Sequence, residues 1–153
     1  MADIASLVQT LERSHHDVFW QGGASAEAIN ELEALLGALL PASFRDFLVS
    51  YGGGGVVEEE ISGIEDDAPV LENRGTVYGD TLRCRADYGL PAGLAVIYCD
   101  DNDAVWCLAT DEMANGECPV VSFDVFSKTN SPIAGDFRSF LLEYLTLRIP
   151  KTK

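Results

Sequence analysis

The sequence is poor in basic residues and in long apolar runs, and each shortage excludes a class of partner. Ten lysines and arginines stand against 25 aspartates and glutamates, which gives a formal net charge of −15 and an isoelectric point near 4.2. A field this negative repels nucleic acid and anionic lipid, so we expect neither as a partner. The longest apolar stretch, LPAGLAVIYC, is too short to cross a bilayer, so we expect no membrane partner or span.

Sequence patterns that carry catalysis are also missing. There is no GxSxG turn, and the four glycines at 52–55 lack the Lys and Ser/Thr of a phosphate-binding loop. His15 and His16 are adjacent, so they cannot supply the i, i+4 pair of a helical zinc site. The four cysteines, none of them in a CxxC pair, are Cys84, Cys99, Cys107 and Cys118. A cysteine hydrolase needs a thiolate beside a base, and none of the four cysteines lies in the sequence signature of a known cysteine-hydrolase family. We therefore expect no enzymatic activity, no metal and no cofactor.

The acidic turn DDND resembles the start of a calcium loop only in part. Counted from Asp101, Asp103 and Glu112 fall at ligand positions 3 and 12 of an EF-hand. Val105 and Trp106 fall where a ligand and a glycine are required, so a strand is the better interpretation. The opening residues MADIASLVQTLER lack the cationic start and apolar core of a signal peptide. We expect a cytoplasmic protein with reduced thiols.

Helical periodicity marks the beginning and the end of the chain. Apolar residues at i, i+3, i+4 and i+7 from Ile4 predict a helix that ends at Ser14. A second helix follows Ser25, a favourable N-cap, and stops at Gly37. The segment GDFRSFLLEYLTLRI predicts a closing helix with an aromatic and leucine face.

The stretch LPASFRDFLVSYGGGG predicts another helix, with an abrupt end. Pro41 is tolerated in the first turn of a helix and disfavoured inside it. The aromatic and aliphatic residues that follow lie on one face at helical spacing, which is typical of a core face. Gly52 can then adopt the positive φ of a helix C-cap, and the next glycines let the chain pass into a sheet.

The centre of the sequence favours strands. VVEEEISGI opens like a strand, EDDAP reads as a turn, and residues 73–88 predict a helix. The apolar run LAVIYC predicts a strand covered on both faces. AVWCLA returns after a turn, and PVVSFDVF follows the turn dipeptide Asn115-Gly116, so three successive strands are expected to form a meander. VFWQGGA, which contains Trp20, reads as an irregular link.

These residues resemble the SUKH superfamily and, within it, the Smi/Knr-type branch, named partly for a yeast regulator of cell-wall synthesis. The family motif has a Trp and a Gly, an I..LE..LG..LP segment, an aromatic helix and a glycine pair. Its positions here are Trp20, Gly23, Ile29, Leu32, Glu33, Leu36, Gly37, Leu40, Pro41, Phe44, Phe47, Leu48, Tyr51, Gly53 and Gly54. LPAGLAVIYCDDNDAVWCLATD and CPVVSFD resemble the family's later strands, so the similarity covers nearly the whole chain. Gly52 stands where members usually have Asn, which also tolerates the left-handed conformation.

The resemblance implies a single α+β domain over residues 1–153. Its mainly antiparallel sheet has about four to six strands, with N-terminal helices, a middle helix and a C-terminal helix packed beside it. The resemblance also implies function, because most bacterial members resemble immunity proteins of polymorphic toxin systems. Such a protein binds one toxin domain, often a nuclease, and blocks it in the cytosol. The motif residues themselves are interpreted as architectural, although Trp20 also fits an exposed binding anchor.

The acidic clusters are the candidates for a toxin-binding surface. Residues 58–124 hold 16 of the 25 acids and 3 of the 10 bases. A nuclease carries a basic surface for its substrate, and acidic clusters can mimic phosphate there and speed association. The predicted partner-binding residues are Glu58, Glu59, Glu60, Glu65, Asp66, Asp67, Asp100, Asp101 and Asp103. The alternative interpretation is that these charges are solvated faces that keep the protein soluble.

Two other functions stay open at this level. The protein fits a regulatory adaptor with several weaker partners and no toxin, as the eukaryotic relatives are understood to be. It also fits a small-molecule binder with a pocket between sheet and helices.

Overall fold

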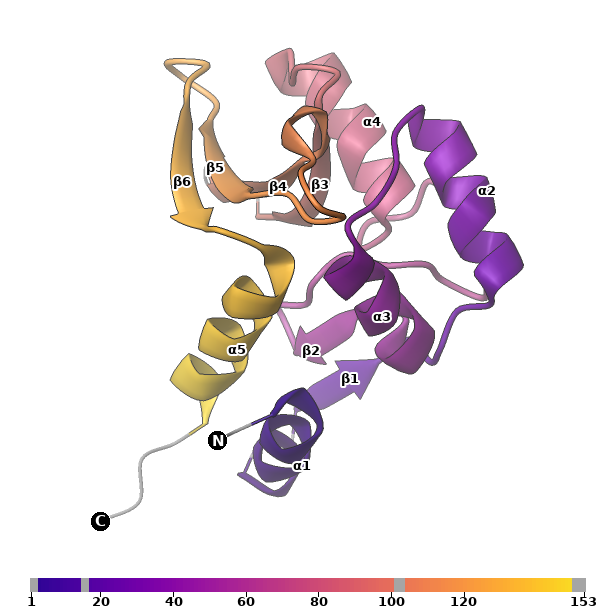
Figure 1. Cartoon of the computed structure of the whole chain (residues 1–153), viewed down its shortest axis with the longest axis vertical. Helices are drawn as coiled ribbons and strands as arrows, with labels where there is room; N and C mark the ends of the chain where they lie inside the picture. Colours follow the sequence, from indigo (N-terminus) through magenta and orange to yellow (C-terminus); the bar gives the residue numbers. More distant parts are fainter. Residues whose placement is uncertain (1–2, 15–16, 101–103, 150–153) are drawn as a thin grey trace.

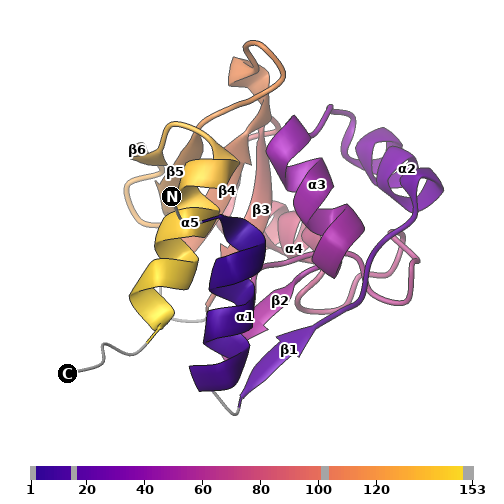
Figure 2. The same cartoon turned by 60° about the horizontal axis from the view of Figure 1, so that its bottom comes forward.

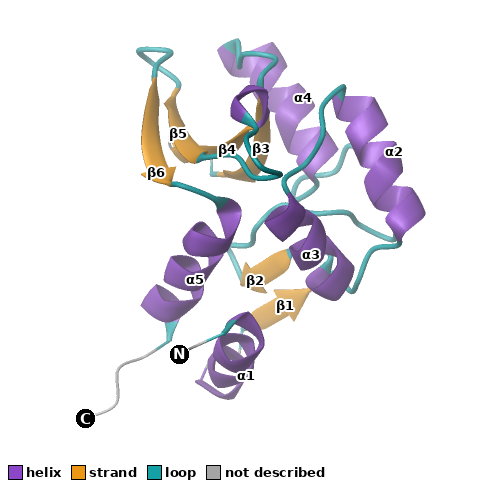
Figure 3. Cartoon of the chain, viewed as in Figure 1, coloured by secondary structure: helices purple, strands orange, loops and turns teal. Residues whose placement is uncertain are grey.

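The computed structural model describes residues 3–14, 17–100 and 104–149, and within these ranges the protein is α+β (Figures 1 and 3). The helices are α1 (Ile4–Ser14), α2 (Ala26–Leu36), α3 (Ala42–Tyr51), α4 (Val77–Tyr88) and α5 (Phe137–Arg148), with a short 3-10 turn at Thr110–Glu112. The strands are β1 (Val18–Trp20), β2 (Gly54–Val56), β3 (Leu94–Cys99), β4 (Ala104–Ala109), β5 (Val120–Asp124) and β6 (Asn130–Ala134).

The larger sheet is an antiparallel meander in the order β3-β4-β5-β6. Neighbouring strands pair in sequence, so that Val96 lies opposite Cys107 and Val105 lies opposite Phe123. The three strands predicted from LAVIYC, AVWCLA and PVVSFDVF are confirmed. Nothing in the sequence NSPIA predicts β6, because it contains a proline and no alternation of polar and apolar residues.

Side chains on both faces of β3 are buried, as the apolar run LAVIYC predicts, whereas β6 is mostly exposed. On one face Val96, Cys107 and Phe123 pack with Cys84 of α4. The other face contributes to a larger core that also takes side chains from α1, α2, α3 and α5. Figure 2 shows α1 lying alongside α5, so the first and last helices of the chain close this core together.

The ends of α2 and α3 follow the predicted capping residues. The Ser25 side chain accepts a backbone hydrogen bond at the start of α2, and Gly37 closes the helix at φ 70°. Pro41 is the N-cap of α3 and thus lies just before its first turn. Gly52 closes α3 at φ 73°, the left-handed conformation that glycine adopts at least cost.

The segment VFWQGGA, predicted to be irregular, forms β1 in its first three residues, Val18–Trp20, and is irregular only after them. This strand pairs antiparallel with β2, with Phe19 opposite Gly55 and Trp20 opposite Gly54. Gly54 has a φ of 119°, and a Cβ at this position would collide with the backbone carbonyl of Phe19. The glycine run is therefore half of a close-packed ribbon. Strand propensity does not reveal it, because glycine is depleted in strands.

The strand predicted to open at VVEEEISGI is shorter than expected. β2 ends at Val56, and Glu58 to Glu60 lie in a turn, with Glu58 at φ 78°. The chain then returns to β2, where Gly54 and Ile61 exchange backbone hydrogen bonds of 2.8 and 2.9 Å. The turn therefore connects two segments that are hydrogen-bonded to each other.

The outer edge of β3 is closed by the segments that lead from the ribbon into α4. The Val96 N–H donates to Thr81 Oγ1 of α4 at 2.9 Å, and the Ser62 N–H donates to the Ile97 carbonyl at 2.7 Å. These two contacts hold the chain after β2 and the beginning of α4 against the end of β3. The candidate site lies at this junction.

Candidate partner-binding surface

A pocket of about 260 Å³ opens where β1, β2, the start of α4 and the end of β3 meet. We call it the Asp80 pocket. Its lining includes Phe19, Glu58, Glu60, Arg83, Tyr98 and Cys99. Arg74 and Asp80 also line it, so both signs of charge face the same hollow. The pocket is thus polar, with an aromatic side chain from β1 at one wall and another from β3.

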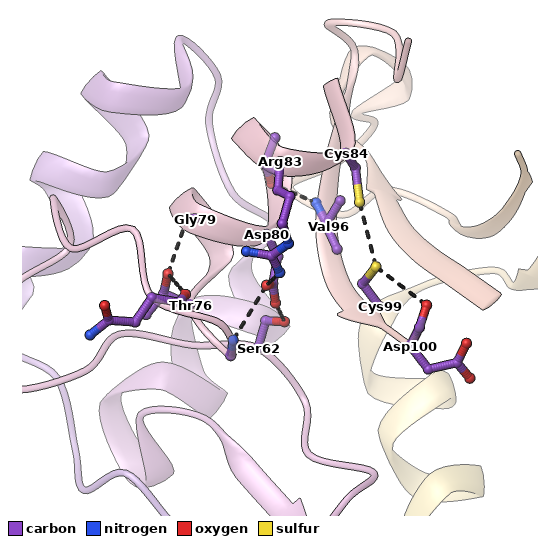
Figure 4. Close-up of polar contacts among 12 residues, drawn as sticks. Ser62, Thr76, Gly79, Asp80, Arg83, Cys84, Val96, Cys99 and Asp100 are labelled. Atoms are coloured by element: carbon purple, nitrogen blue, oxygen red, sulfur yellow. Dashed lines mark hydrogen bonds and ion pairs between the residues drawn. The ribbon is translucent and has the colours of Figure 1, made fainter. Parts of the chain in front are cut away.

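Asp80 is a buried carboxylate, with 3% of its surface exposed, that organises the pocket. Its Oδ2 accepts a 2.6 Å hydrogen bond from Ser62 Oγ, and its Oδ1 accepts one of 3.3 Å from the Gly75 N–H. The Arg83 guanidinium, one helical turn along α4, forms an ion pair with Oδ1 (Figure 4). A buried charge is tolerated when it is paired and hydrogen-bonded, and this network supplies both conditions.

The helix that carries Asp80 begins with a side-chain cap. The Thr76 hydroxyl accepts the Gly79 N–H at 3.0 Å and itself donates to the Asn73 carbonyl at 2.7 Å (Figure 4). A Cβ at position 79 would clash with the backbone of Glu72, so only glycine lets this loop pass so close. The cap and the close approach place Asp80 in the first turn of α4, facing Ser62.

The three glutamates predicted to bind a partner separate into two kinds. Glu58 and Glu60 line the pocket, and Glu60 Oε1 accepts the Glu58 N–H at 3.0 Å. Glu59 is instead bound within the protein, because its Oε1 accepts a 2.7 Å hydrogen bond from Arg148 Nε of α5. The first and third glutamates therefore form the acidic part of the pocket.

Asp100 joins this surface at the end of β3. The Tyr98 hydroxyl donates to its Oδ2 at 3.4 Å. Burial raises the pKa of Tyr98, and the negative charges of Asp100 and Glu59 raise it further, so these two carboxylates lie in one electrostatic neighbourhood. The predicted residues Asp101 and Asp103 lie outside the described residues.

The other predicted acidic cluster lies elsewhere. Glu65 Oε1 accepts a 2.9 Å hydrogen bond from Asn73 Nδ2, and Asp67 Oδ1 accepts the Ser25 N–H at 2.8 Å. Asp66 and Asp67 are exposed, and both have a φ of 54°. The structure therefore places this cluster beside the start of α2 and not in the lining of the Asp80 pocket.

The exposed aromatic residue of β1 is Phe19, and not Trp20. Phe19 is 47% exposed and lines the pocket. Trp20 points to the opposite side of the ribbon, where its ring lies 4.9 Å from that of Tyr51, and its Nε1 donates to Glu12 Oε2 at 3.0 Å. Phe19 faces the pocket and Trp20 does not because neighbouring side chains of a strand point to opposite faces. Trp20 is thus a packing residue, and Phe19 takes the exposed position on β1.

The residues of the family motif lie in the core and at its corners. Ile29, Leu32, Leu36, Leu40, Pro41, Phe44, Phe47, Leu48, Gly53 and Gly54 are buried, Trp20, Glu33 and Tyr51 are half-buried, and Gly23 and Gly37 are exposed. Glu33 fixes the corner between α2 and α3, because its Oε2 accepts the Leu40 N–H and its Oε1 binds Arg45 Nη1, both at 2.7 Å. These positions account for the motif by packing and turn geometry.

Sequence reasoning missed Asp80, Arg83 and Phe19. Asp80 carried one weak signal, since an acid in the first turn of a helix is favourable. Its burial depends on hydrogen bonds from Ser62 and Gly75, and the sequence does not show that these residues lie beside it. Phe19 was hidden because β1 itself was not predicted.

These features define an α+β protein built from a four-stranded antiparallel meander, a small glycine-rich ribbon and helices on both faces of the larger sheet. The model of the SUKH_5 family, described as SMI1-KNR4 cell-wall, matches residues 4–146. The chain therefore belongs to this family, and the match runs from the first residue of α1 into the last turn of α5. Among the described residues, no helix combines the length and the apolar character that crossing a membrane requires. The same residues contain no group of three or more His, Cys, Asp or Glu side chains arranged to hold a metal ion.

Proposed function

We propose that this protein is a cytosolic immunity protein that binds and neutralises one basic toxin domain through the surface around the Asp80 pocket. It acts by occlusion and not as an enzyme. Membership in the SUKH_5 family points to protein–protein interaction in general and is consistent with such a role. The toxin domain is the finer part of the proposal, and a nuclease is the class that the charge suits best.

The observation that carries the proposal is the gathering of acids and an exposed aromatic residue around one hollow. Glu58 and Glu60 line the pocket, Asp100 follows Cys99 at its edge, and Phe19 presents nearly half of its surface. Protein interfaces depend on a few aromatic or charged anchors that fill a pocket on the partner. Because Arg83 is paired with Asp80, a lysine or arginine of the toxin would meet Glu58 and Glu60 here, and Phe19 would cover its aliphatic stem.

The charge of the whole chain supports the same partner. With a net charge of −15, the protein attracts a basic domain from a distance and accelerates their encounter. An inhibitor of an intracellular toxin benefits from a fast association rate, because the toxin acts as soon as it is free.

The first test is growth rescue. The toxic domain to express is the C-terminal domain of a large secreted protein encoded beside this chain, with and without the chain itself. The proposal expects the domain to stop growth alone and growth to return when the chain is present, while an unrelated member of the family does not restore it. If a domain that stops growth is not counteracted by this chain, the proposal is wrong and the adaptor function is favoured.

The pocket itself raises a second candidate function, that of a small-molecule binder. Its volume of about 260 Å³ is below the range of about 300–1,000 Å³ that is usual for ligand pockets, so an inserted side chain of a protein fits it better. Thermal-shift screening of the purified protein against metabolites separates the two functions. A shift that Asp80→Asn abolishes would favour the small molecule.

A further inference from the structure

Two cysteines from different elements face each other beside the Asp80 pocket. Cys84 lies in the middle of α4 and Cys99 is the last residue of β3, and their sulfur atoms are 3.5 Å apart (Figure 4). The Cys84 thiol donates a hydrogen bond to Cys99 Sγ. The two elements cannot drift apart easily, since Thr81 of α4 is hydrogen-bonded to Val96 of β3 one turn away.

The two thiols differ in access and in acidity. Cys99 is half-buried and lines the pocket, whereas Cys84 is fully buried behind it. The hydrogen bond from Cys84 lowers the pKa of Cys99, and the Arg83 guanidinium lowers it further, against burial and the charges of Asp80 and Asp100. Donating that hydrogen bond, together with burial, raises the pKa of Cys84. Cys99 is thus the more acidic thiol of the pair, and it is also the one that lines the pocket.

We propose that Cys84 and Cys99 form a two-cysteine oxidation site, in which a small hydroperoxide entering the Asp80 pocket converts the pair to an intramolecular disulfide. This inference goes beyond toxin binding and does not depend on it. A disulfide requires the two sulfurs to approach to about 2.0 Å, and they start in contact.

The reaction proceeds in two balanced steps. In the first, the Cys99 thiolate attacks one peroxide oxygen; a sulfur–oxygen bond forms, the oxygen–oxygen bond breaks, and the departing oxygen takes up a proton and leaves as water or an alcohol. In the second, Cys84 sulfur attacks Cys99 Sγ; the sulfur–sulfur bond forms, the sulfur–oxygen bond breaks, and the hydroxide leaves as water with the Cys84 proton. Two thiols are oxidised by two electrons, and one peroxide is reduced.

The remaining cysteines serve as internal controls. Cys107 of β4 and Cys118 are both buried. Burial raises the pKa of each of these two thiols, that of Cys118 to about 11, so both stay protonated at neutral pH. Neither lines the Asp80 pocket. The site should therefore consume two of the four thiols and leave the other two.

The test is to treat the reduced, folded protein with hydrogen peroxide and digest it, without reduction, with a protease that cuts before aspartate. Such a digest places each cysteine in its own peptide, at residues 80–86, 87–99, 103–110 and 111–123. We expect the intact mass to fall by two hydrogen atoms and the peptide 80–86 to be joined to 87–99. A thiol titration should show the loss of two of the four thiols.

Single substitutions sharpen the result. Cys107→Ser and Cys118→Ser should form the cross-link as the wild type does, and Cys84→Ser should not. In Cys84→Ser, a dimedone label for sulfenic acid should appear on the peptide that ends at Cys99. The proposal is overturned if wild-type protein keeps all four thiols under peroxide that oxidises free cysteine. It is also overturned if the cross-link involves another peptide, or if it forms only in denaturant. The digest of the wild-type protein tests the proposal even if a variant fails to fold.

Discussion

Arg148 Nε, near the end of α5, donates a 2.7 Å hydrogen bond to Glu59 Oε1, 89 residues earlier in the chain. The same guanidinium lies 3.8 Å from the ring centroid of Tyr144. The Tyr144 hydroxyl in turn donates to the Glu59 carbonyl at 2.8 Å and accepts the Val56 N–H at 3.1 Å. The last helix therefore holds in place the turn that carries Glu58 and Glu60, the acidic part of the pocket.

Replacing Arg148 should weaken this attachment modestly. Arg148→Ala removes the ion pair with Glu59, which is half-exposed, and the stacking on Tyr144, so the free energy of unfolding should fall by about 1 kcal/mol. Urea unfolding of the wild type and the variant measures this difference in the free energy of unfolding. Arg138→Ala, an exposed position on the same helix, is the matched control and should change stability by less than about 0.5 kcal/mol. Equal effects at both positions would show that the contact with Glu59 does not stabilise the fold.

Charge reversal at the pocket should slow binding to the basic partner. Glu58→Lys/Glu60→Lys should reduce the association rate about tenfold or more at low salt and flatten its salt dependence, because the local attraction becomes repulsion. Stopped-flow or surface-binding kinetics with the purified toxin domain would measure both quantities. Glu59 is left unchanged here because its substitution would also break the bond to Arg148.

The control for this experiment carries the same change in net charge at another place. Glu27→Lys/Glu31→Lys alters two exposed positions of α2, away from the lining of the pocket. It should affect the association rate less than the pocket variant does. If the two double variants slow association equally, only the overall field matters and the pocket is not the interface.

The glycine ribbon should not tolerate a side chain. Gly54→Ala places a methyl group against the Phe19 carbonyl and demands a φ of 119°, so we expect a loss of at least about 2 kcal/mol of stability. Gly135→Ala is the matched control, because a Cβ there meets no atom within 4 Å. Thermal and urea unfolding compare the two. A Gly54→Ala protein as stable as the control would mean that β1 and β2 do not pack this closely.

Stability should decline at alkaline pH in a way that traces to Tyr144. Burial raises the pKa of Tyr144 to about 12, above its ordinary value near 10. Between these values the folded state holds a proton that the unfolded state has lost, so the free energy of unfolding falls as pH rises. This contribution is fully present below about pH 10.

The comparison with Tyr144→Phe isolates that residue. The variant loses two hydrogen bonds at neutral pH and should be less stable by about 1–3 kcal/mol. The advantage of the wild type over the variant should then shrink between about pH 10 and about pH 12, while ionisation of the other tyrosines and cysteines affects both proteins alike. Urea unfolding at a series of pH values checks this, and a constant difference would contradict it.

The sequence predicts those elements that follow local rules. The helix ends at Ser25, Gly37 and Gly52 were found because capping depends on one residue and its immediate neighbours. The strand LAVIYC was found because two-sided burial leaves an apolar run. In both cases the signal that predicts the element lies within a few residues of the sequence.

The elements that escaped prediction depend on distant partners. β1 is a strand because Gly54 and Gly55 allow another backbone to lie against it, and β6 because it borders β5. The candidate site divides in the same way. The sequence reveals the acidic clusters by their charge. It does not reveal that Arg148 binds Glu59 or that Ser62 binds the buried Asp80, because these contacts join distant parts of the chain.

The backbone groups at the two edges of the larger sheet also affect how readily a strand of another molecule can pair with it. An open edge strand can template fibril growth, because its row of free donors and acceptors accepts another strand. At the β3 edge the Val96 N–H and the Ile97 carbonyl are already used by Thr81 and Ser62. At the β6 edge Pro132 has no N–H to offer, so that row is interrupted. Each border of the larger sheet therefore offers fewer free backbone groups to a strand of another molecule than a bare edge strand would.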